Sequence, residues 1–181
     1  MATHSSMATP REVPGWCPLD RPAVGDDEIF EVLTAAVFQA RFRPDVVRAR
    51  WPAIRVALEG FSLRTVASWP DEMAESLAER PGVIRNGKKL RAVVRNARNL
   101  QALAREYGSA LAYLDSFRPD PEALVRGLDE WAHYVGAPSL RWFVKCAGVT
   151  RRWRGDVRAL PWSPAENPHE IGKNGPLPEQ R

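Results

Sequence analysis

Apolar residues in the middle of the chain recur every three or four positions, which is the spacing of amphipathic helices. Ile29, Leu33 and Val37 follow this spacing and predict a helix over 26–41. No segment alternates apolar and polar residues in the manner of a half-buried strand. The chain is therefore predicted to be all-α, with further helices over 44–60, 62–66, 70–79, 88–107, 109–117, 121–134 and 138–147.

The two ends of the chain differ in composition from this middle part. Residues 1–25 are rich in Pro, Ser and Thr, and residues 161–181 are rich in Pro and Asn. Such segments bury little apolar surface, so we expect a flexible arm, one helical domain over 26–160 and a flexible tail. No apolar run approaches the roughly 18 residues of a membrane helix, so no membrane partner is expected.

Basic residues are unevenly distributed. The net charge of +4 is modest, but Lys and Arg concentrate in residues 85–98 and again in 141–158. Such clusters are either solvated helix faces or a surface that binds a polyanion such as DNA.

The segment around 134–138 has the pattern of a helix-hairpin-helix. A helix predicted to end at Tyr134 meets Gly136, and Pro138 suits the first turn of the next helix. The glycine permits a tight turn, and the amides at the new helix start are free to bind a phosphate. A plain connector between two helices has the same pattern.

Several segments, taken together, resemble one family. Residues 82–85 read Gly-Val-Ile-Arg, residues 96–98 read Asn-Ala-Arg, and residues 134–136 read Tyr-Val-Gly. Upstream, residues 29–31 read Ile-Phe-Glu and residues 38–40 read Phe-Gln-Ala. In this order, over about 26–149, they resemble the 3-methyladenine DNA glycosylase I family.

The resemblance implies a helix-hairpin-helix DNA glycosylase. Such enzymes bind duplex DNA containing alkylated bases, rotate the damaged base into a pocket and hydrolyse its N-glycosidic bond. We expect a cytoplasmic monomer that needs no cofactor. The residues expected to contact DNA are Arg85, Asn86, Lys88, Lys89, Val135, Gly136 and Ala137.

The chain departs from the family pattern at the base pocket. The family's glutamate and glycine before Phe-Gln-Ala are Ala36 and Val37 here, and its pocket tryptophan is replaced by Pro44. Gln39 is then the candidate to pair with a base edge through its amide. Gln39 is alternatively a residue that satisfies backbone groups, and the candidate aromatic walls are alternatively core residues. The expected pocket residues are Phe38, Gln39, Trp51 and Trp142.

Asp156 is the second catalytic candidate. It lies shortly after the helix that follows the hairpin, where other branches of the superfamily carry a catalytic aspartate. Its carboxylate would stabilise an oxocarbenium ion or activate water. The alternative is a surface aspartate among Arg152, Arg154 and Arg158.

The two cysteines suggest neither a disulfide framework nor a metal site. Cys17 and Cys146 lie far apart in sequence, which favours a reducing, cytoplasmic setting. The family's zinc site uses two cysteines and two histidines. Cys17 and His169 are the only remnants, and two ligands are too few, so no metal is expected.

Three functions remain open from the sequence. The first is a monofunctional glycosylase that releases alkylated purines from a remodelled pocket. The second is a non-catalytic DNA- or damage-binding module that kept the hairpin. The third is a helical protein-interaction module, which would show no salt-dependent affinity for DNA. The state of the pocket region discriminates the first two: either Gln39 and the aromatics converge on an open cavity, or the bulky Val37 and Phe42 fill it.

Overall fold

Every regular element that the structure describes is helical. This computed structural model describes residues 16–156, and the all-α prediction is confirmed. The helices are α1 (Asp26–Gln39), α2 (Pro44–Ala57), the 3-10 turn η1 (Glu59–Phe61), α3 (Leu63–Ala67), α4 (Met73–Ala78), α5 (Gly87–Tyr107), α6 (Ala110–Asp115), α7 (Pro121–Asp129), α8 (Ala137–Cys146) and α9 (Val149–Trp153).

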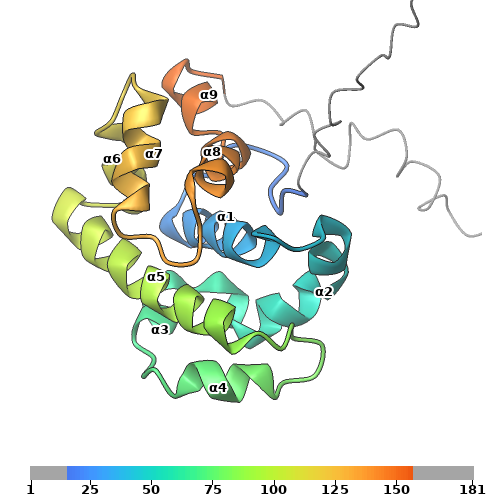
Figure 1. The fold of residues 1–181 in the computed structure, drawn as a ribbon. Helices are drawn as coiled ribbons and strands as arrows, with labels where there is room; N and C mark the ends of the chain where they lie inside the picture. The colour runs from blue at the N-terminus through green and yellow to red at the C-terminus, as the bar shows by residue number, and fades with distance from the viewer. Residues whose placement is uncertain (1–15, 157–181) are drawn as a thin grey trace, which may run out of the picture.

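Helix α1 is the centre of the domain. All its residues from Ile29 to Phe38 are buried, and it contacts α2, α3, α5, α6 and α8 (Figure 1). A helix that is apolar on all sides needs neighbours on all sides. The last turn of α1, where the candidate residue Gln39 lies, is therefore fixed by surrounding helices.

Two aspartates join the start of α1 to two other helices. Aspartate at the start of a helix commonly caps it, but neither Asp26 nor Asp27 caps α1. Instead, Asp26 accepts a hydrogen bond from the amide of Ala110 at the start of α6, and Asp27 accepts one from Leu63 at the start of α3, both 2.8 Å. Helix starts leave amides unpaired, so these carboxylates stabilise α3 and α6.

Residues 16–25 pack against the helical domain. The amide of Ala23 donates to the carbonyl of Ala147 at 3.0 Å, and Ala23 is completely buried. Arg21 forms an ion pair with Glu28 of α1. The domain boundary expected at residue 26 is thus too late. The rest of the arm, residues 1–15, and the tail, residues 161–181, lie outside the described residues.

Three other expectations about helices need correction. Helix α7 ends at Asp129 rather than at Tyr134, and α9 was not expected. A proline inside a helix predicts a kink or break, yet α2 continues through Pro52. Within residues 16–156, no helix is both long enough and apolar enough to cross a membrane.

Candidate nucleic-acid interface and base pocket

The aromatic residues expected to line a base pocket lie in the core. Phe38 is completely buried and Trp51 is 5% exposed. Trp51 stacks on Phe61 with ring centroids 4.9 Å apart, and the rings of Phe38 and Trp16 approach it edge-on at 6.4 and 5.1 Å. Contacts on its face and edges give Trp51 the environment of a core residue, not of a platform for a flipped base.

Trp51 also binds a carboxylate that the sequence analysis did not single out. Its indole nitrogen donates to Glu31 at 2.9 Å, and Arg55 forms an ion pair with the same carboxylate. Glu31 is buried, and burial raises its pKa despite these two donors. Its position on α1, one turn before Ala35, and its two donors identify Glu31 as part of the α1–α2 packing.

In the side-chain amide of Gln39, the nitrogen forms a hydrogen bond and the oxygen does not. Its Nε2 donates to the carbonyl of Trp16 at 2.8 Å. A carbonyl only accepts, so the amide nitrogen faces Trp16 and Oε1 points the other way. This Oε1 is buried and has no hydrogen-bond partner among residues 16–156. Gln39 is thus partly used to hold the chain before α1 and partly available as an acceptor.

A DNA contact would require Lys89 to lie on the surface, but this side chain is buried. It is 3% exposed, and its Nζ donates to the carbonyls of Phe38 and Ala40 at 2.5 and 2.9 Å. The rings of Phe42 and Tyr134 lie 5.2 and 5.7 Å from Nζ. Burial lowers the pKa of Lys89 to about 8. The expectation of a phosphate contact is corrected: Lys89 binds the carbonyls left unpaired at the end of α1.

Three further residues, expected at the DNA interface, the catalytic site and the base pocket, contact other parts of the domain. Asn86 caps α5, since its side chain accepts a hydrogen bond from the amide of Lys89 at 3.1 Å. Asp156 follows α9 and forms a salt bridge with Arg151 at 3.1 Å. Trp142, the fourth expected pocket residue, is partly buried and packs against the core.

The two cysteines form a disulfide, which corrects the expectation drawn from their separation. The Cα atoms of Cys17 and Cys146 are 5.8 Å apart. The bond joins the segment that carries Trp16 to the end of α8. It also removes the argument for a reducing compartment that was based on unpaired cysteines.

The zinc site of the resemblance does not fit the described residues. Cys17 is bonded to Cys146 and is not free to bind a metal. In the part of the chain that the structure describes, no three His, Cys, Asp or Glu side chains gather as ligands, and His169 lies outside it.

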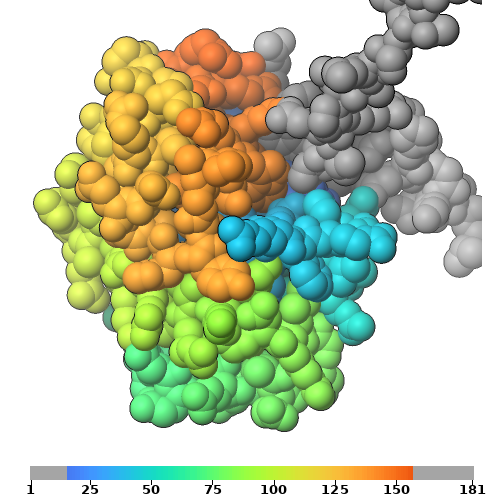
Figure 2. All heavy atoms as spheres, viewed as in Figure 1, coloured from blue at the N-terminus to red at the C-terminus, as the bar shows by residue number. Residues whose placement is uncertain are grey.

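A basic cavity lies between α5 and the connection to α8. We call it the α5–hairpin cavity. It has a volume of about 270 Å³ and is lined by Lys88, Arg91, Ala92, Arg95, His133 and Tyr134. Figure 2 shows α5, in yellow-green, and the hairpin with α8, in orange, on the same face of the molecule. Within residues 16–156, Lys88, Arg91 and Arg95 form no hydrogen bond or ion pair with another side chain, so their charges are available to a ligand. Arg85, also expected at this face, is exposed.

The hairpin itself is held against α5 by Asn96. Its side-chain oxygen accepts from the amide of His133 at 2.7 Å, and its nitrogen donates to the carbonyl of His133 at 3.1 Å. Asn96 is 1% exposed. This pair of bonds explains the asparagine in the Asn-Ala-Arg segment. Its role was missed, although its helical spacing from Val93 and Leu100 places it on the core side of α5.

The turn before α8 leaves backbone groups open. Tyr134, not Gly136, has the left-handed conformation, with φ of +63°, while Gly136 is extended with φ of −121°. A Cβ on Gly136 would meet only Pro138, at 4.0 Å, and no side chain caps α8. Glycine is thus not needed for the turn, but it leaves the first amides of α8 uncovered. Of the amides that the sequence analysis proposed as phosphate donors, Ala137 begins α8, and Val135 and Gly136 lie just before it.

The structure explains why a glycine occupies position 82 of the Gly-Val-Ile-Arg segment. Its φ is +81°, and a Cβ there would lie 2.7 Å from the Cβ of Ala53 in α2. Both the backbone conformation and the close approach require glycine. This turn positions the start of α5 and therefore the cationic side chains that follow.

Comparison with known proteins identifies the family and the fold of this chain. A family model described as methyladenine glycosylase matches residues 16–134. The chain belongs to the methyladenine glycosylase family. Solved structures of 3-methyladenine DNA glycosylase I share the fold. One covers 71% of this chain and 81% of its own, with 22% identity and a TM-score of 0.62.

Two other structures of the same enzyme are similar. A variant in complex with 3-methyladenine has a TM-score of 0.65 at 19% identity, covering 72% of this chain and 81% of its own. The enzyme from Staphylococcus aureus has a TM-score of 0.61 at 19% identity, covering 72% and 80%. At this identity the likeness establishes the fold, while the residues of this family member must be judged individually.

Proposed function

We propose that this family member binds duplex DNA with the face formed by the start of α5 and the turn before α8. The observation that carries the proposal is the α5–hairpin cavity. Three cations without ionic partners, Lys88, Arg91 and Arg95, line it beside the hairpin. The uncapped start of α8 adds backbone amides and the positive end of a helix dipole. Phosphate oxygens are the ligands that match both kinds of donor.

Salt dependence tests this proposal. Each cation that neutralises a DNA phosphate contributes about 0.9 to the slope of log affinity against log salt concentration. We expect Lys88→Gln, Arg91→Gln and Arg95→Gln together to lower that slope by about 2 to 3. A matched control replaces three exposed arginines that do not line the cavity, Arg118, Arg126 and Arg154, with Gln. An equal loss in both triple variants, or no DNA binding by the wild type, would exclude the proposed face.

Excision of alkylated purines is the second candidate function, and the free oxygen of Gln39 favours it. Oε1 of Gln39 is a buried acceptor without a partner, and its direction is set by the bond from Nε2 to Trp16. It is suited to accept a hydrogen bond from the exocyclic amino group of adenine. An N3- or N7-alkylated purine is cationic and leaves readily, so positioning and exclusion of water contribute much of the acceleration.

In this candidate mechanism the chain acts as a monofunctional glycosylase. The bond between the sugar and the cationic base breaks, and the base leaves as a neutral purine. Water adds its hydroxyl to the sugar carbon and releases a proton to solvent. Asp156 is the proposed carboxylate that stabilises the positive charge developing on the sugar. Asp156 forms a salt bridge with Arg151 at 3.1 Å. Without a carboxylate at Ala36, we expect activity on charged alkylated bases and none on uncharged oxidised ones.

Base release from methylated duplex DNA decides between excision and binding alone. Release of 3-methyladenine or 7-methylguanine, lost in Gln39→Ala and in Asp156→Asn while DNA affinity is kept, would establish the glycosylase. Release confined to uncharged lesions would contradict the role given to the missing carboxylate. No release with intact DNA affinity identifies a non-catalytic binding module, which the core positions of Phe38 and Trp51 favour.

We also propose that the protein works as a monomer on DNA. One chain supplies both the α5 cations and the hairpin amides, so the proposed face needs no second subunit. Sedimentation with and without a short duplex tests this stoichiometry.

A further inference from the structure

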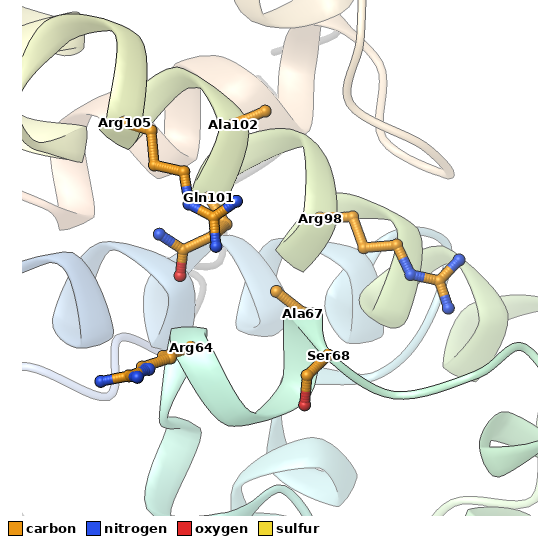
Figure 3. A pocket seen from close by; sticks show the side chains of 7 residues that line it. All are labelled: Arg64, Ala67, Ser68, Arg98, Gln101, Ala102 and Arg105. Atoms are coloured by element: carbon orange, nitrogen blue, oxygen red, sulfur yellow. The ribbon is translucent and has the colours of Figure 1, made fainter.

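A second cationic cavity lies beside the C-terminal half of α5. We call it the α3–α5 cavity. It has a volume of about 330 Å³ and is lined by Arg64, Ala67, Ser68, Arg98, Gln101, Ala102 and Arg105. Figure 3 shows Arg105 and Gln101 reaching from α5 toward α3, with Arg64 below them. No carboxylate is among its described lining residues.

The charges of this cavity are only partly compensated. Arg98 turns away from the other two arginines and binds Asp71 at 2.6 Å and the carbonyl of Trp69 (Figure 3). The same contact lowers the pKa of Asp71, so this pair stays ionised. Within residues 16–156, the side chains of Arg64, Arg105 and Gln101 form no hydrogen bond or ion pair. Two guanidinium groups and one amide are therefore free to bind an anion.

The two cavities lie along one stripe of α5. Its lining residues Arg91, Arg95, Arg98, Ala102 and Arg105 follow each other by four, three, four and three positions. This spacing keeps side chains on one face of a helix. From Lys88 to Arg105 the helix rises about 26 Å at about 1.5 Å per residue. Along one DNA strand, at about 3.4 Å per nucleotide, this length corresponds to roughly seven or eight nucleotides.

We infer that the α3–α5 cavity is a second phosphate site, in which Arg64 and Arg105 bind the backbone of the nucleic acid held at the hairpin. The inference rests on the proposed DNA-binding function and extends it, because it assigns a footprint along the whole of α5. Guanidinium groups bind phosphate oxygens in a bidentate manner, and the amide of Gln101 adds a donor. Ser68 donates its hydroxyl to Thr65 at 2.7 Å and is not counted as a ligand.

The test compares two lengths of duplex DNA. On a duplex of about 20 base pairs, we expect Arg64→Gln with Arg105→Gln to lower the salt slope by about 2, as two phosphate contacts are lost. On a stem-loop whose duplex has about 4 base pairs, shorter than the roughly seven or eight nucleotides that span α5, we expect the slope to change little, since a duplex held at the hairpin does not reach the second site. Both side chains are exposed and unpartnered, so the variant should unfold at the wild-type temperature.

The matched control is Arg126→Gln with Arg154→Gln. These exposed arginines belong to α7 and the end of α9, which lie away from α3 in Figure 1. The control removes the same charge and should leave the slope on the long duplex unchanged. An equal loss in both double variants, or an unchanged slope for Arg64→Gln with Arg105→Gln, would overturn the second site.

Two outcomes separate the inference from the function on which it rests. Wild-type protein that binds neither duplex would remove the proposed DNA-binding function itself. Binding that depends on Lys88, Arg91 and Arg95 but not on Arg64 and Arg105 would overturn the second site alone. Sodium phosphate that shifts the amide resonances of Arg64 and Arg105, without any slope change for the variant, would identify a small-anion site and contradict the inference.

Discussion

The end of α1 and the start of α5 lie next to each other but differ in how their polar groups are used. At the end of α1, Lys89 and the nitrogen of Gln39 both bind backbone carbonyls within the protein. At the start of α5, the neighbouring Lys88 is exposed and forms no ion pair within residues 16–156. Adjacent lysines on one helix therefore serve packing in one case and an open, cationic surface in the other.

This difference distinguishes the surface proposed to bind the DNA backbone from the region proposed to select a base. The surface proposed to hold the DNA backbone has kept free donors and an uncapped helix start. The segment before Phe38, which the sequence analysis assigned to the base pocket, is instead apolar, and Ala36 and Val37 are both buried. DNA binding is thus supported by more of the site than selection of a particular base.

The largest effect is expected from removing the disulfide, which anchors the segment that contacts the end of α1. Cys17→Ser with Cys146→Ser opens a link between residues 129 positions apart. We expect the free energy of unfolding to fall by about 3 kcal/mol, measured in denaturant. The salt slope of DNA binding should not change, because neither cysteine lies at the α5–hairpin cavity. Equal stability of the variant and the wild type would contradict the structural role of this bond.

The second effect concerns the pH dependence of the two adjacent lysines. The pKa of Lys89 is about 8 in the folded protein and near 10.5 in an unfolded chain. Between these values the unfolded state binds more protons, so the free energy of unfolding should rise with pH through this contribution, by up to about 1.4 kcal/mol per pH unit.

Variants of both lysines isolate this contribution from other titrating groups. Denaturant unfolding is measured from pH 8 to pH 10 for the wild type, Lys88→Met and Lys89→Met. The rise should persist in Lys88→Met and be absent in Lys89→Met. Identical pH profiles for the two variants would show that Lys89 is not desolvated.

The smallest expected effect comes from replacing Arg41. Arg41 follows α1 with a left-handed φ of +56°. This conformation is costly for residues with a Cβ. We expect Arg41→Gly to raise the free energy of unfolding by about 1 kcal/mol or slightly less. A lower thermal midpoint for Arg41→Gly would indicate that the arginine side chain makes a compensating contact.

Sequence reasoning was most successful where a periodic pattern decides the structure. The helical spacing of Ile29, Leu33 and Val37 predicts α1, and the segment from Lys88 to Gly108 predicts α5 with nearly its observed ends. The end of α7 was missed because Trp131 and Ala132 continue an apolar pattern while the backbone already turns toward the hairpin.

Side-chain roles at the site were harder to predict, for two physical reasons. Lys89 lies four positions before Val93 and eleven before Leu100, so its helical position indicates burial, but its charge suggested the surface. The partners of Trp51 and Cys17 come from distant parts of the chain, and no local pattern reveals contacts of that kind. The glycines and asparagines of the matched segments were found as motifs, and their structural reasons became visible only in three dimensions.

Hydrogen exchange in the presence and absence of duplex DNA tests the central claim most directly. If DNA binds at the α5–hairpin face, the amides of residues 133–140 and the first turn of α5 should exchange more slowly in the complex. The amides of residues 36–40 at the end of α1 should be unaffected by undamaged DNA. Protection at the end of α1 with none at the hairpin would contradict the account and would place the DNA contact on the other region.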